Sequence, residues 1–358
     1  MKNQYRLYVE VAPFYQDLVE TIGQANHDIS MMYFTYDCGK WSRQINAVLY
    51  RKVEQGVKVR IMVDLLGFFS DHPKNIHRNI TQISEMKRNG IQVNFFQPGV
   101  ESKMTPIDRL HFKICAVDKN VIYIGGSNIG DHYTNWQDTN LRVEGDIGMV
   151  GHDLYDYVFF HSRGGHPAPD IDLDNLWIGD AQACLTVPGQ REDIADSWLD
   201  LIRSSKSTVY FRNWYFLPNN IFMAAILEKL NQGQDIEVLL SHRTRVPVID
   251  IANHTQSQVL VNNGARIFRY HSRYMHSKVT WTREGDILFG SANLEDKALK
   301  GNFEFCLRFT DLEISRELIS HFRQDSFNSL YQSREVVSDR NVFKKASSYI
   351  FSLATPLL

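Results

Sequence analysis

Two histidine–lysine patterns stand far apart in the 358-residue chain, one in each half. His111 and Lys113 form the first pattern, and His276 and Lys278 form the second. Residues two apart on a β-strand project to the same face, so each pair would present a titratable nitrogen beside a positive charge. This combination of groups suits a phosphate. The two pairs therefore predict a site for phosphate chemistry.

A turn that contains Gly, Ser and Asn follows each pair at the same interval. Asn128 and Asn293 each lie 17 residues after the histidine of their half. Glycine permits a close backbone approach, so the N–H groups and the Ser and Asn side chains of such turns can reach phosphate oxygens. One His-x-Lys pattern arises by chance, but two copies with equally spaced turns favour a single shared site. The turn residues expected to bind substrate are Gly126, Ser127, Gly290 and Ser291.

These residues resemble the signature of the phospholipase D superfamily, H-x-K-x(4)-D followed by a G-G/S-x-N turn. The first copy matches in full, with Asp118 as its acid, whereas Arg283 stands at that place in the second copy. Within the superfamily the chain is most similar to cardiolipin synthases, and the similarity spans nearly all of it. The segments that carry it are GGSNIGDHY at 125–133, WQDT at 136–139, RVEG at 142–145, GSANL at 290–294 and NFE at 302–304.

The resemblance implies a two-step reaction through a covalent phosphohistidine, without a metal or cofactor. A neutral histidine attacks phosphorus, and a protonated one gives its proton to the leaving alcohol. The resemblance makes His111 the nucleophile and His276 the acid and base, although the pseudo-symmetry of the halves leaves the reverse order open. The residues implied to hold the phosphoryl oxygens and stabilise the transition state are Lys113, Lys278, Asn128 and Asn293.

The family also places a carboxylate downstream of each motif, where it would fix the tautomer of the histidine. Asp138 follows His111 by 27 residues, and Glu304 follows His276 by 28. These near-equal offsets pair each carboxylate with the histidine of its own half. An ordinary surface acid is the alternative at either position.

The acid of the first motif has two interpretations. The family signature includes Asp118 among the catalytic residues. Strand parity instead turns Asp118 and Arg283 away from the face of the histidines, which favours a structural role in fixing a turn. Arg283 would then affect the alignment of the second copy more than its chemistry, and Asp286 is the candidate to replace the missing acid.

Several further residues follow predicted strands, at the edge where α/β sheets place ligands. Asp64 ends one strand and is either a site residue or a helix cap, and Phe34 and Asp37 end the strand before it. Five more residues are candidates for lining the pocket or contacting a head group, with a solvated loop as the alternative: His132, His242, Arg243, Arg245 and His271.

The elements that must position these residues recur in the same order in both halves. Helical periodicity alternates with strand-like runs at 29–36, 57–63 and 91–96, and again at 208–216, 236–240 and 266–270. Strands alternating with helices predict an α/β fold with mixed sheets. With the resemblance, we expect two pseudo-symmetric α-β-α sandwich halves of phospholipase D-like fold, packed together with the active site at their interface.

We divide the chain into a first phospholipase D-like repeat at 1–165, a second at 171–340 and an amphipathic tail at 341–358. The boundary signal is the Gly- and Pro-rich segment HSRGGHPAPD at 161–170. In the tail, apolar residues fall at helical spacing opposite lysines and serines. That pattern suits a membrane interface, and a helix docked on the protein is the alternative.

Composition argues against several classes of function. The chain has 39 basic and 41 acidic residues, a net charge of -2 and no Lys/Arg-rich run, which argues against nucleic acid as a partner. None of the four cysteines forms a C-x-x-C pair, so zinc and redox motifs have no support. No run of about 18 apolar residues is present, so we expect a cytoplasmic protein in peripheral contact with a membrane.

The leading hypothesis is a phosphatidyltransferase of cardiolipin synthase type, which acts on a phospholipid such as phosphatidylglycerol. A hydrolytic phospholipase D and a phosphodiesterase or nuclease of the same superfamily are the alternatives within this chemistry. A catalytically inactive lipid-binding homologue is the alternative of another class, because Arg283 departs from the motif. Two motifs in one chain make a dimer unnecessary, so we expect a functional monomer.

Overall fold

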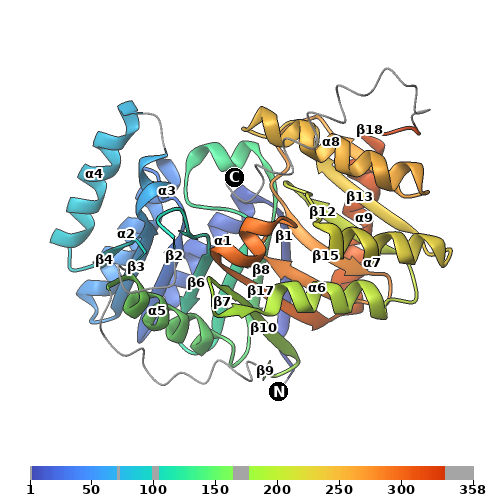
Figure 1. The fold of residues 1–358 in the computed structure, drawn as a ribbon. Coiled ribbons are helices and arrows are strands. Elements are labelled where there is room, and N and C mark those ends of the chain that lie inside the picture. The colour runs from blue at the N-terminus through green and yellow to red at the C-terminus, as the bar shows by residue number, and fades with distance from the viewer. Residues whose placement is uncertain (1, 71–72, 99–104, 164–176, 335–358) are drawn as a thin grey trace.

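The computed structural model describes residues 2–70, 73–98, 105–163 and 177–334. Two mixed sheets lie side by side, the first on the left and the second on the right of Figure 1. Helices cover both sheets, which confirms the predicted α/β class with two α-β-α halves. The predicted repeat boundary at 165–171 and the predicted tail at 341–358 lie outside the described residues.

The first sheet combines a parallel unit with antiparallel strands. In order across the sheet, its strands are β1 (Gln4–Glu10), β8 (Gln137–Glu144), β7 (Val121–Gly125), β6 (Lys113–Val117), β2 (Asp28–Tyr33), β3 (Lys58–Asp64) and β4 (Gln92–Phe96). β2, β3 and β4 run parallel, and β6 lies antiparallel to β2. Tyr33, at the end of β2, therefore lies opposite Lys113, at the start of β6.

The second sheet repeats this arrangement. In order across the sheet, its strands are β11 (Arg191–Glu192), β10 (Ala181–Val187), β17 (Asn302–Thr310), β16 (Asp286–Gly290), β15 (Lys278–Thr282), β12 (Val209–Asn213), β13 (Ile236–Ser241), β14 (Arg266–Tyr270) and β18 (Ser329–Tyr331). β9 (Trp177–Ile178) pairs with β10, and β5 (Arg109–Leu110) pairs with β17. Asn213 ends the parallel strand β12 opposite Lys278 of β15, so the second lysine occupies the place of Lys113.

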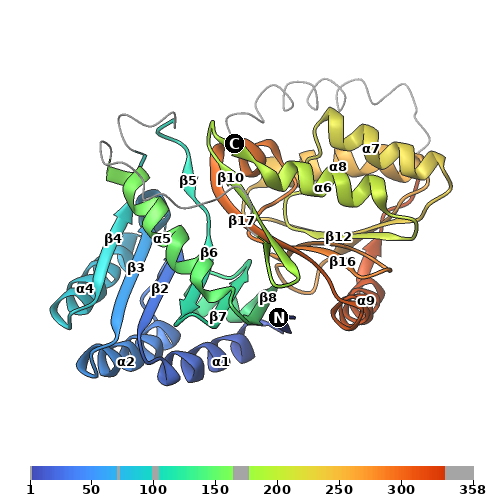
Figure 2. The same cartoon turned by 90° about the horizontal axis from the view of Figure 1, so that it is seen from below.

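Each sheet has helices on both faces, as Figure 2 shows. The first sheet carries α1 (Val11–Gln24), α2 (Lys40–Glu54) and α4 (Pro73–Arg88) on one face and α5 (Gly148–Arg163) on the other, with the short α3 (Leu65–Phe69) after β3. The second carries α6 (Asp193–Ser204), α7 (Asn220–Asn231) and α8 (Pro247–Asn262) on one face and α9 (Leu312–Phe327) on the other. The short turns are η1 (Asp131–Asn135) and η2 (Lys297–Gly301).

Amphipathic spacing explains why these helices cover the sheets. In α1, the buried residues Phe14, Leu18 and Ile22 recur four apart, so they form one apolar stripe that packs in the outer core of the first half. None of the helices in the described ranges combines the length and apolarity needed to cross a bilayer.

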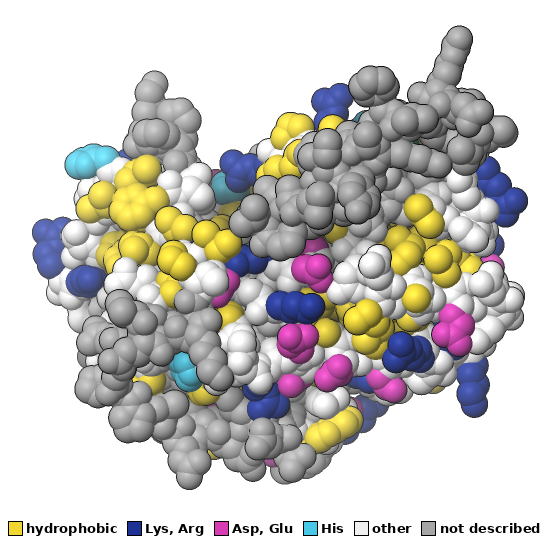
Figure 3. Space-filling model, in the orientation of Figure 1, with side chains coloured by type: hydrophobic (Ala, Val, Ile, Leu, Met, Phe, Trp, Pro, Cys, Tyr) yellow, Lys and Arg dark blue, Asp and Glu magenta, His cyan; other side chains and the backbone are white. Residues whose placement is uncertain are grey.

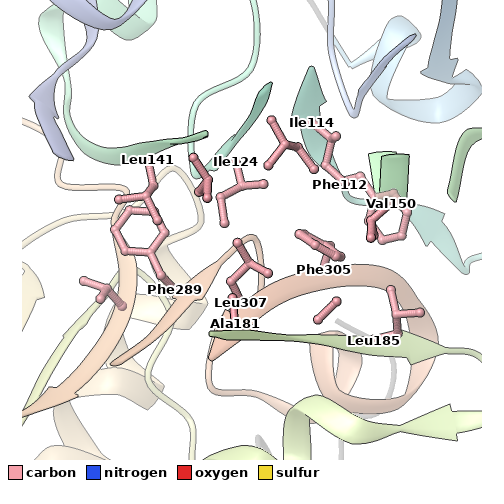
Figure 4. Close-up of a cluster of buried hydrophobic side chains, with 14 of the residues drawn as sticks. Phe112, Ile114, Ile124, Leu141, Val150, Ala181, Leu185, Phe289, Phe305 and Leu307 are labelled. Carbon is pink, nitrogen blue, oxygen red and sulfur yellow. The ribbon is translucent and has the colours of Figure 1, made fainter. Parts of the chain in front are cut away.

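A large cluster of buried side chains lies between the two sheets. Phe112 and Ile114 of the first half meet Phe305 and Leu307 of the second, and Figure 4 shows the two groups facing each other. Cys115 belongs instead to the outer core beneath α1 and α2. This alternation shows that Phe112 and Ile114 face the core between the sheets, whereas Cys115 faces the helices. Because side chains of both sheets pack in this cluster, it fixes the position of β6, which follows the first motif histidine, relative to β15, which follows the second.

Two backbone contacts between the halves position the histidines. β5 pairs with β17, and the N–H of His111 donates to the carbonyl of Phe303 at 2.9 Å. On the other side, Gln137 forms a bridge with the residue before His276, and the N–H of His276 donates to the carbonyl of Gln137 at 2.8 Å. Each histidine is therefore attached to a strand of the opposite half.

Candidate active site

The two histidines exchange their carboxylate partners between the halves. His111 Nδ1 lies 2.7 Å from Glu304 Oε1, and His276 Nδ1 lies 2.9 Å from Asp138 Oδ2. Spacing along the chain had paired each carboxylate with the histidine of its own half, and that pairing is wrong. The attachment of each histidine to the opposite strand explains the exchange, because β17 carries Glu304 and β8 carries Asp138.

The two lysines are buried and turn back onto their own motifs. Lys113 Nζ donates to the carbonyl of His111 at 2.8 Å, and Lys278 Nζ donates to the carbonyl of His276. Burial lowers the pKa of Lys113 well below its usual value and lowers the pKa of Lys278 to about 7, although the nearby carboxylates oppose both shifts. Desolvated ammonium groups of this kind favour an anionic ligand.

All four motif residues belong to one electrostatic cluster. Burial first, and then the charges of Lys113 and Lys278, lower the pKa of His111 well below its usual value. Burial, Lys278, Lys113 and then His111 lower the pKa of His276 in the same direction. The structure therefore brings the two predicted pairs together, with imidazoles that are neutral near pH 7.

The two carboxylates are fully buried, and the motif serines support them. Burial raises the pKa of Asp138 to about 7 and that of Glu304 to about 8, against the opposing charges of the lysines. Ser127 Oγ donates to Asp138 Oδ2 at 3.1 Å, and Ser291 Oγ donates to Glu304 Oε2 at 2.5 Å. The sequence predicted that these serines contact substrate. Their hydroxyls instead hold the carboxylates that hold the histidines.

The motif glycines allow this close packing. A Cβ atom at Gly126 would lie 2.1 Å from Asp138 Oδ1, and one at Gly290 would lie 2.2 Å from the carbonyl oxygen of Phe305. Both distances are far below van der Waals contact, so no larger residue fits without backbone movement. Gly126 therefore packs directly against β8, which carries Asp138, and Gly290 packs against β17, which carries Glu304.

The two motif asparagines have different surroundings. Asn128 Oδ1 accepts from the N–H of Thr35 at 3.1 Å, and its Nδ2 donates to the hydroxyl of Tyr133 at 3.2 Å. Asn293 Oδ1 is buried and has no hydrogen-bond partner within the described part of the chain. In the second turn, the side-chain oxygen of Asn293 is thus left without a hydrogen bond. In the first turn, Asn128 is hydrogen-bonded to Thr35, in the loop after β2, and to Tyr133.

An aromatic ring lies against each histidine, and one of these rings was missed in the sequence. The ring centroids of Phe34 and His111 are 5.5 Å apart, and those of Trp214 and His276 are 4.0 Å apart. The ammonium of each motif lysine lies over the same ring, at 5.7 Å for Phe34 and 5.4 Å for Trp214. Each aromatic residue directly follows the parallel strand beside its motif, so this shared position was the available signal.

Asp118 lies at the far end of β6 from Lys113 and takes no part in the charge cluster. Its carboxylate accepts from the backbone N–H groups of Asn26, His27 and Asp28, at 2.8 to 3.1 Å for its best contacts. Its backbone has a φ of 49°, a left-handed conformation that Asp tolerates. Its place in the catalytic set is therefore corrected to the structural role that strand parity favoured.

The second half anchors the equivalent corner with a different acid. Arg283 is exposed, and the neighbouring Glu284 accepts a hydrogen bond from the hydroxyl of Ser207, in the loop before β12. Asp286, the candidate replacement from the sequence, instead binds the guanidinium of Arg308 at 2.9 and 3.2 Å. The substitution at 283 therefore lies away from the motif histidine and lysine.

The remaining candidates divide into a cap and a pocket. Asp64 caps α3 by accepting from Gly67 N at 2.8 Å and also accepts from Leu110 N at 2.9 Å, which matches the helix-cap alternative. Four of the other candidates gather in one pocket beside Trp136, and the guanidinium of the fifth, Arg245, lies 5.8 Å from the Trp136 ring centroid. The four that line the pocket are His132, His242, Arg243 and His271.

Comparison with known sequences identifies the family. A family model described as "Cardiolipin synthase, PLD-like domain" matches residues 18–147 and 198–326, one match in each half. Cardiolipin synthase 1 of Staphylococcus aureus (strain COL) is 24% identical over 374 residues, which cover 99% of this chain and 74% of that protein. A cardiolipin synthase of Staphylococcus aureus (strain Mu50 / ATCC 700699) is 25% identical over 378 residues, with the same coverage.

Solved structures share the fold. The phosphatidylserine synthase of Haemophilus influenzae Rd KW20 superposes with a TM-score of 0.72 at 14% identity, covering 99% of this chain and 93% of that one. A polyphosphate kinase from Porphyromonas gingivalis gives a TM-score of 0.60 at 15% identity, covering 99% of this chain and 53% of that one. With the family model matched in both halves, the chain belongs to the cardiolipin synthase family of phospholipase D-like domains and is a phospholipase D-type phosphotransferase.

Proposed function

We propose that this enzyme is a phosphatidyltransferase of cardiolipin synthase type, which moves a phosphatidyl group between phospholipids through a covalent phosphohistidine. The observation that carries the proposal is the pair of histidines, His276 buried and His111 partly exposed, each bonded to a carboxylate of the opposite half and flanked by a lysine. Phosphatidylglycerol is the proposed substrate, in keeping with the named relatives.

In the first step His111 attacks the phosphorus of the donor lipid. Its lowered pKa keeps the ring neutral, and Glu304 Oε1 accepts a hydrogen bond from Nδ1–H, so that Nε2 presents its lone pair. An N–P bond forms, the P–O bond to the glycerol head group breaks, and His276 gives its proton to the leaving glycerol oxygen.

The bound phosphate prepares the second histidine for this role. In the free site, burial and two lysine charges disfavour a protonated His276. The negative charge of a phosphodiester offsets those charges, so substrate binding raises the proton affinity of the imidazole. Lys113 and Lys278 are proposed to hold the phosphoryl oxygens, because their ammonium groups have no side-chain hydrogen-bond partner among the described residues. Asn293, whose side chain is also hydrogen-bonded to Glu295, would add its amide N–H groups.

In the second step an acceptor hydroxyl replaces the histidine. His276 takes the hydroxyl proton, the oxygen attacks phosphorus, and the N–P bond to His111 breaks. A second phosphatidylglycerol as acceptor gives cardiolipin, and water gives phosphatidic acid. Hydrolysis is therefore the second candidate, since water can complete the same site.

One chain contains everything that this scheme requires. Each histidine finds its carboxylate in the other half of the same chain. We therefore propose that the repeats at 1–165 and 171–340 act as one unit in a monomer at a membrane surface. Figure 3 shows the face of the molecule that is seen in Figure 1. Over the described part of this face, Lys and Arg are interspersed with acidic and apolar side chains, without a continuous basic stripe for nucleic acid.

A product assay tests the proposal. Vesicles of labelled phosphatidylglycerol and, separately, labelled single-stranded DNA are offered to the enzyme, and the products are separated by chromatography. Cardiolipin is expected from the vesicles, and the His111→Ala and His276→Ala variants should form none. Phosphatidic acid alone would establish the hydrolase, nucleotides would establish a nuclease, and no product would favour the inactive lipid-binding homologue.

A further inference from the structure

A cationic pocket lies beside the catalytic cluster, next to His276. It has a volume of about 670 Å³ and opens at the carboxyl ends of β13 and β14, against η1. Its described lining residues include three histidines and two arginines but no carboxylate: His132, His242, His271, Arg243 and Arg273. Acids approach only part of this lining, with Asp37 3.9 Å from His132 Nδ1 and Glu10 paired with Arg273, so the excess of basic side chains favours an anionic ligand.

One arginine of the pocket has no acidic partner among the described residues. Arg273 is paired with Glu10, but the guanidinium of Arg243 makes no hydrogen bond or ion pair within the described ranges. His242 Nδ1 is a buried atom without a hydrogen-bond partner in the same ranges. Burial, then Arg269, Arg243 and His271, lower the pKa of His242, against an opposing effect of Asp250. A bound anion would relieve this repulsion between like charges.

The pocket shares a wall with His276. Trp136 lines the pocket, and its ring centroid is 5.5 Å from that of His276. Tyr274, also in the lining, precedes His276 by two residues, and its ring centroid lies 5.5 Å from that of Trp136 with the two rings tilted. A ligand held here would therefore lie next to the histidine that receives the acceptor proton in the proposed reaction.

The first half carries different side chains at its equivalent strand end. There Asp64, at the end of β3, caps α3 and faces the guanidinium of Arg109 at 3.6 Å. At the end of β13 the chain has Ser241 followed by His242 and Arg243. Two pseudo-symmetric halves thus differ at the place where a second substrate would approach.

We propose that this pocket binds the phosphodiester head group of the acceptor phospholipid, while the free hydroxyl of that head group reaches His276. This proposal rests on the transfer reaction proposed above, and it assigns the acceptor phospholipid of that reaction to this pocket. The phosphodiester contacts Arg243, His242 and His271, and the short polyol beyond it passes Trp136. The hydroxyl oxygen then forms its bond to phosphorus as the N–P bond to His111 breaks and the proton passes to His276.

The ratio of transfer to hydrolysis tests this assignment. Arg243→Gln and His271→Asn, alone and together, are assayed on phosphatidylglycerol vesicles, with the exposed Arg203→Gln on α6 as the matched control. Loss of one charged contact to the acceptor should lower the ratio of cardiolipin to phosphatidic acid by about tenfold, because water needs no such contact. An unchanged ratio, including a parallel fall of both products, or an equal fall in Arg203→Gln overturns the assignment.

A binding measurement keeps the test independent of turnover. Calorimetric titration with glycerophosphoglycerol, the head group without acyl chains, should show a site that is lost in the Arg243→Gln/His271→Asn double variant. Inorganic phosphate should bind that site more weakly, and equal binding of phosphate would make it a free-anion site instead. If the enzyme forms no lipid product at all, the proposed function fails, and this titration still decides whether the pocket takes a phosphodiester head group.

Discussion

At the scale of single residues, the exchange of carboxylates is the feature with the clearest chemical consequence. Glu304 serves His111 and Asp138 serves His276, so each catalytic unit contains a residue from both halves. Burial places all four groups in surroundings where protonation depends on close neighbours rather than on solvent. A carboxylate variant should therefore disable the histidine of the opposite half, which a kinetic separation of the two steps can detect.

A substrate with an activated leaving group separates these steps. With phosphatidyl-p-nitrophenol, the first step needs little acid catalysis, so Asp138→Asn and His276→Ala should retain a burst of nitrophenol with slow turnover. Glu304→Gln should lower the burst rate by about 10²-fold or more, because the tautomer of His111 is no longer fixed, and His111→Ala should abolish it. A lost burst in Asp138→Asn with a normal burst in Glu304→Gln would restore the pairing within each half.

The lowered pKa values also predict how activity depends on pH. His111 is neutral above its depressed pKa, so protonation of His111 itself should not limit kcat/KM above pH 6.5. Lys278 has a pKa of about 7 and loses its charge as the pH rises, so the alkaline limb should lie near pH 7. Lys278→Arg, which stays charged, should move the alkaline limb upward by more than one pH unit. An alkaline limb that the Lys278→Arg variant leaves in place contradicts this assignment.

At the scale of elements, the two halves secure the same corner by different acids. Asp118 joins the turn after β6 to the start of β2 through three backbone N–H groups. Glu284 joins the turn after β15 to the loop before β12 by accepting from the hydroxyl of Ser207 and from the backbone of Lys206. Arg283, where the second motif departs from the family signature, therefore affects only how the far end of β15 is anchored. At the other end of β15, the second half keeps the motif residues His276 and Lys278.

The two anchors should differ in their effect on stability. Partial burial raises the pKa of Asp118, but its backbone N–H donors outweigh this and leave the pKa below the usual value. Asp118→Asn should lower the free energy of unfolding at pH 7 by about 1–2 kcal/mol, a value reduced for solvent exposure. Glu284→Gln, as the matched change in the second half, should cost less than about 0.5 kcal/mol.

The sign of the pH dependence follows from the depressed pKa. Between the folded and unfolded pKa values the unfolded chain binds more protons, so the stabilisation by Asp118 is complete above about pH 4 and declines at lower pH. Urea unfolding of the enzyme and the Asp118→Asn variant from pH 3 to pH 7 measures this. A difference that stayed constant down to pH 3 would show that the charge of Asp118 is not the cause.

At the scale of the whole molecule, the core between the sheets decides whether an active site exists. Phe305 lies in that core, and its neighbour Glu304 is bonded to His111 of the other half. Small shifts between the sheets would therefore separate histidines from carboxylates. The same packing brings the histidine of each half to a carboxylate of the other half within one chain.

Truncation of a core side chain tests this dependence. Phe305→Ala should lower the free energy of unfolding by about 3–5 kcal/mol through lost burial and a cavity, and transfer activity should fall with it. Phe327→Ala is the matched control, since that side chain is 91% exposed and its loss should cost about 0.5 kcal/mol or less. Full transfer activity in a destabilised Phe305→Ala protein would contradict the link between core and site.

The sequence by itself determined the fold class and the two His–Lys pairs, because strand and helix periodicities are local and a twofold repeat of them defines matching halves. It also favoured the structural role of Asp118 through strand parity. Only the tertiary structure decided that Glu304 serves His111, that the serines hold carboxylates, and that Glu284 rather than Asp286 anchors the second corner. His111 and Glu304 are 193 residues apart, and their contact depends on how two sheets pack, which no local spacing records.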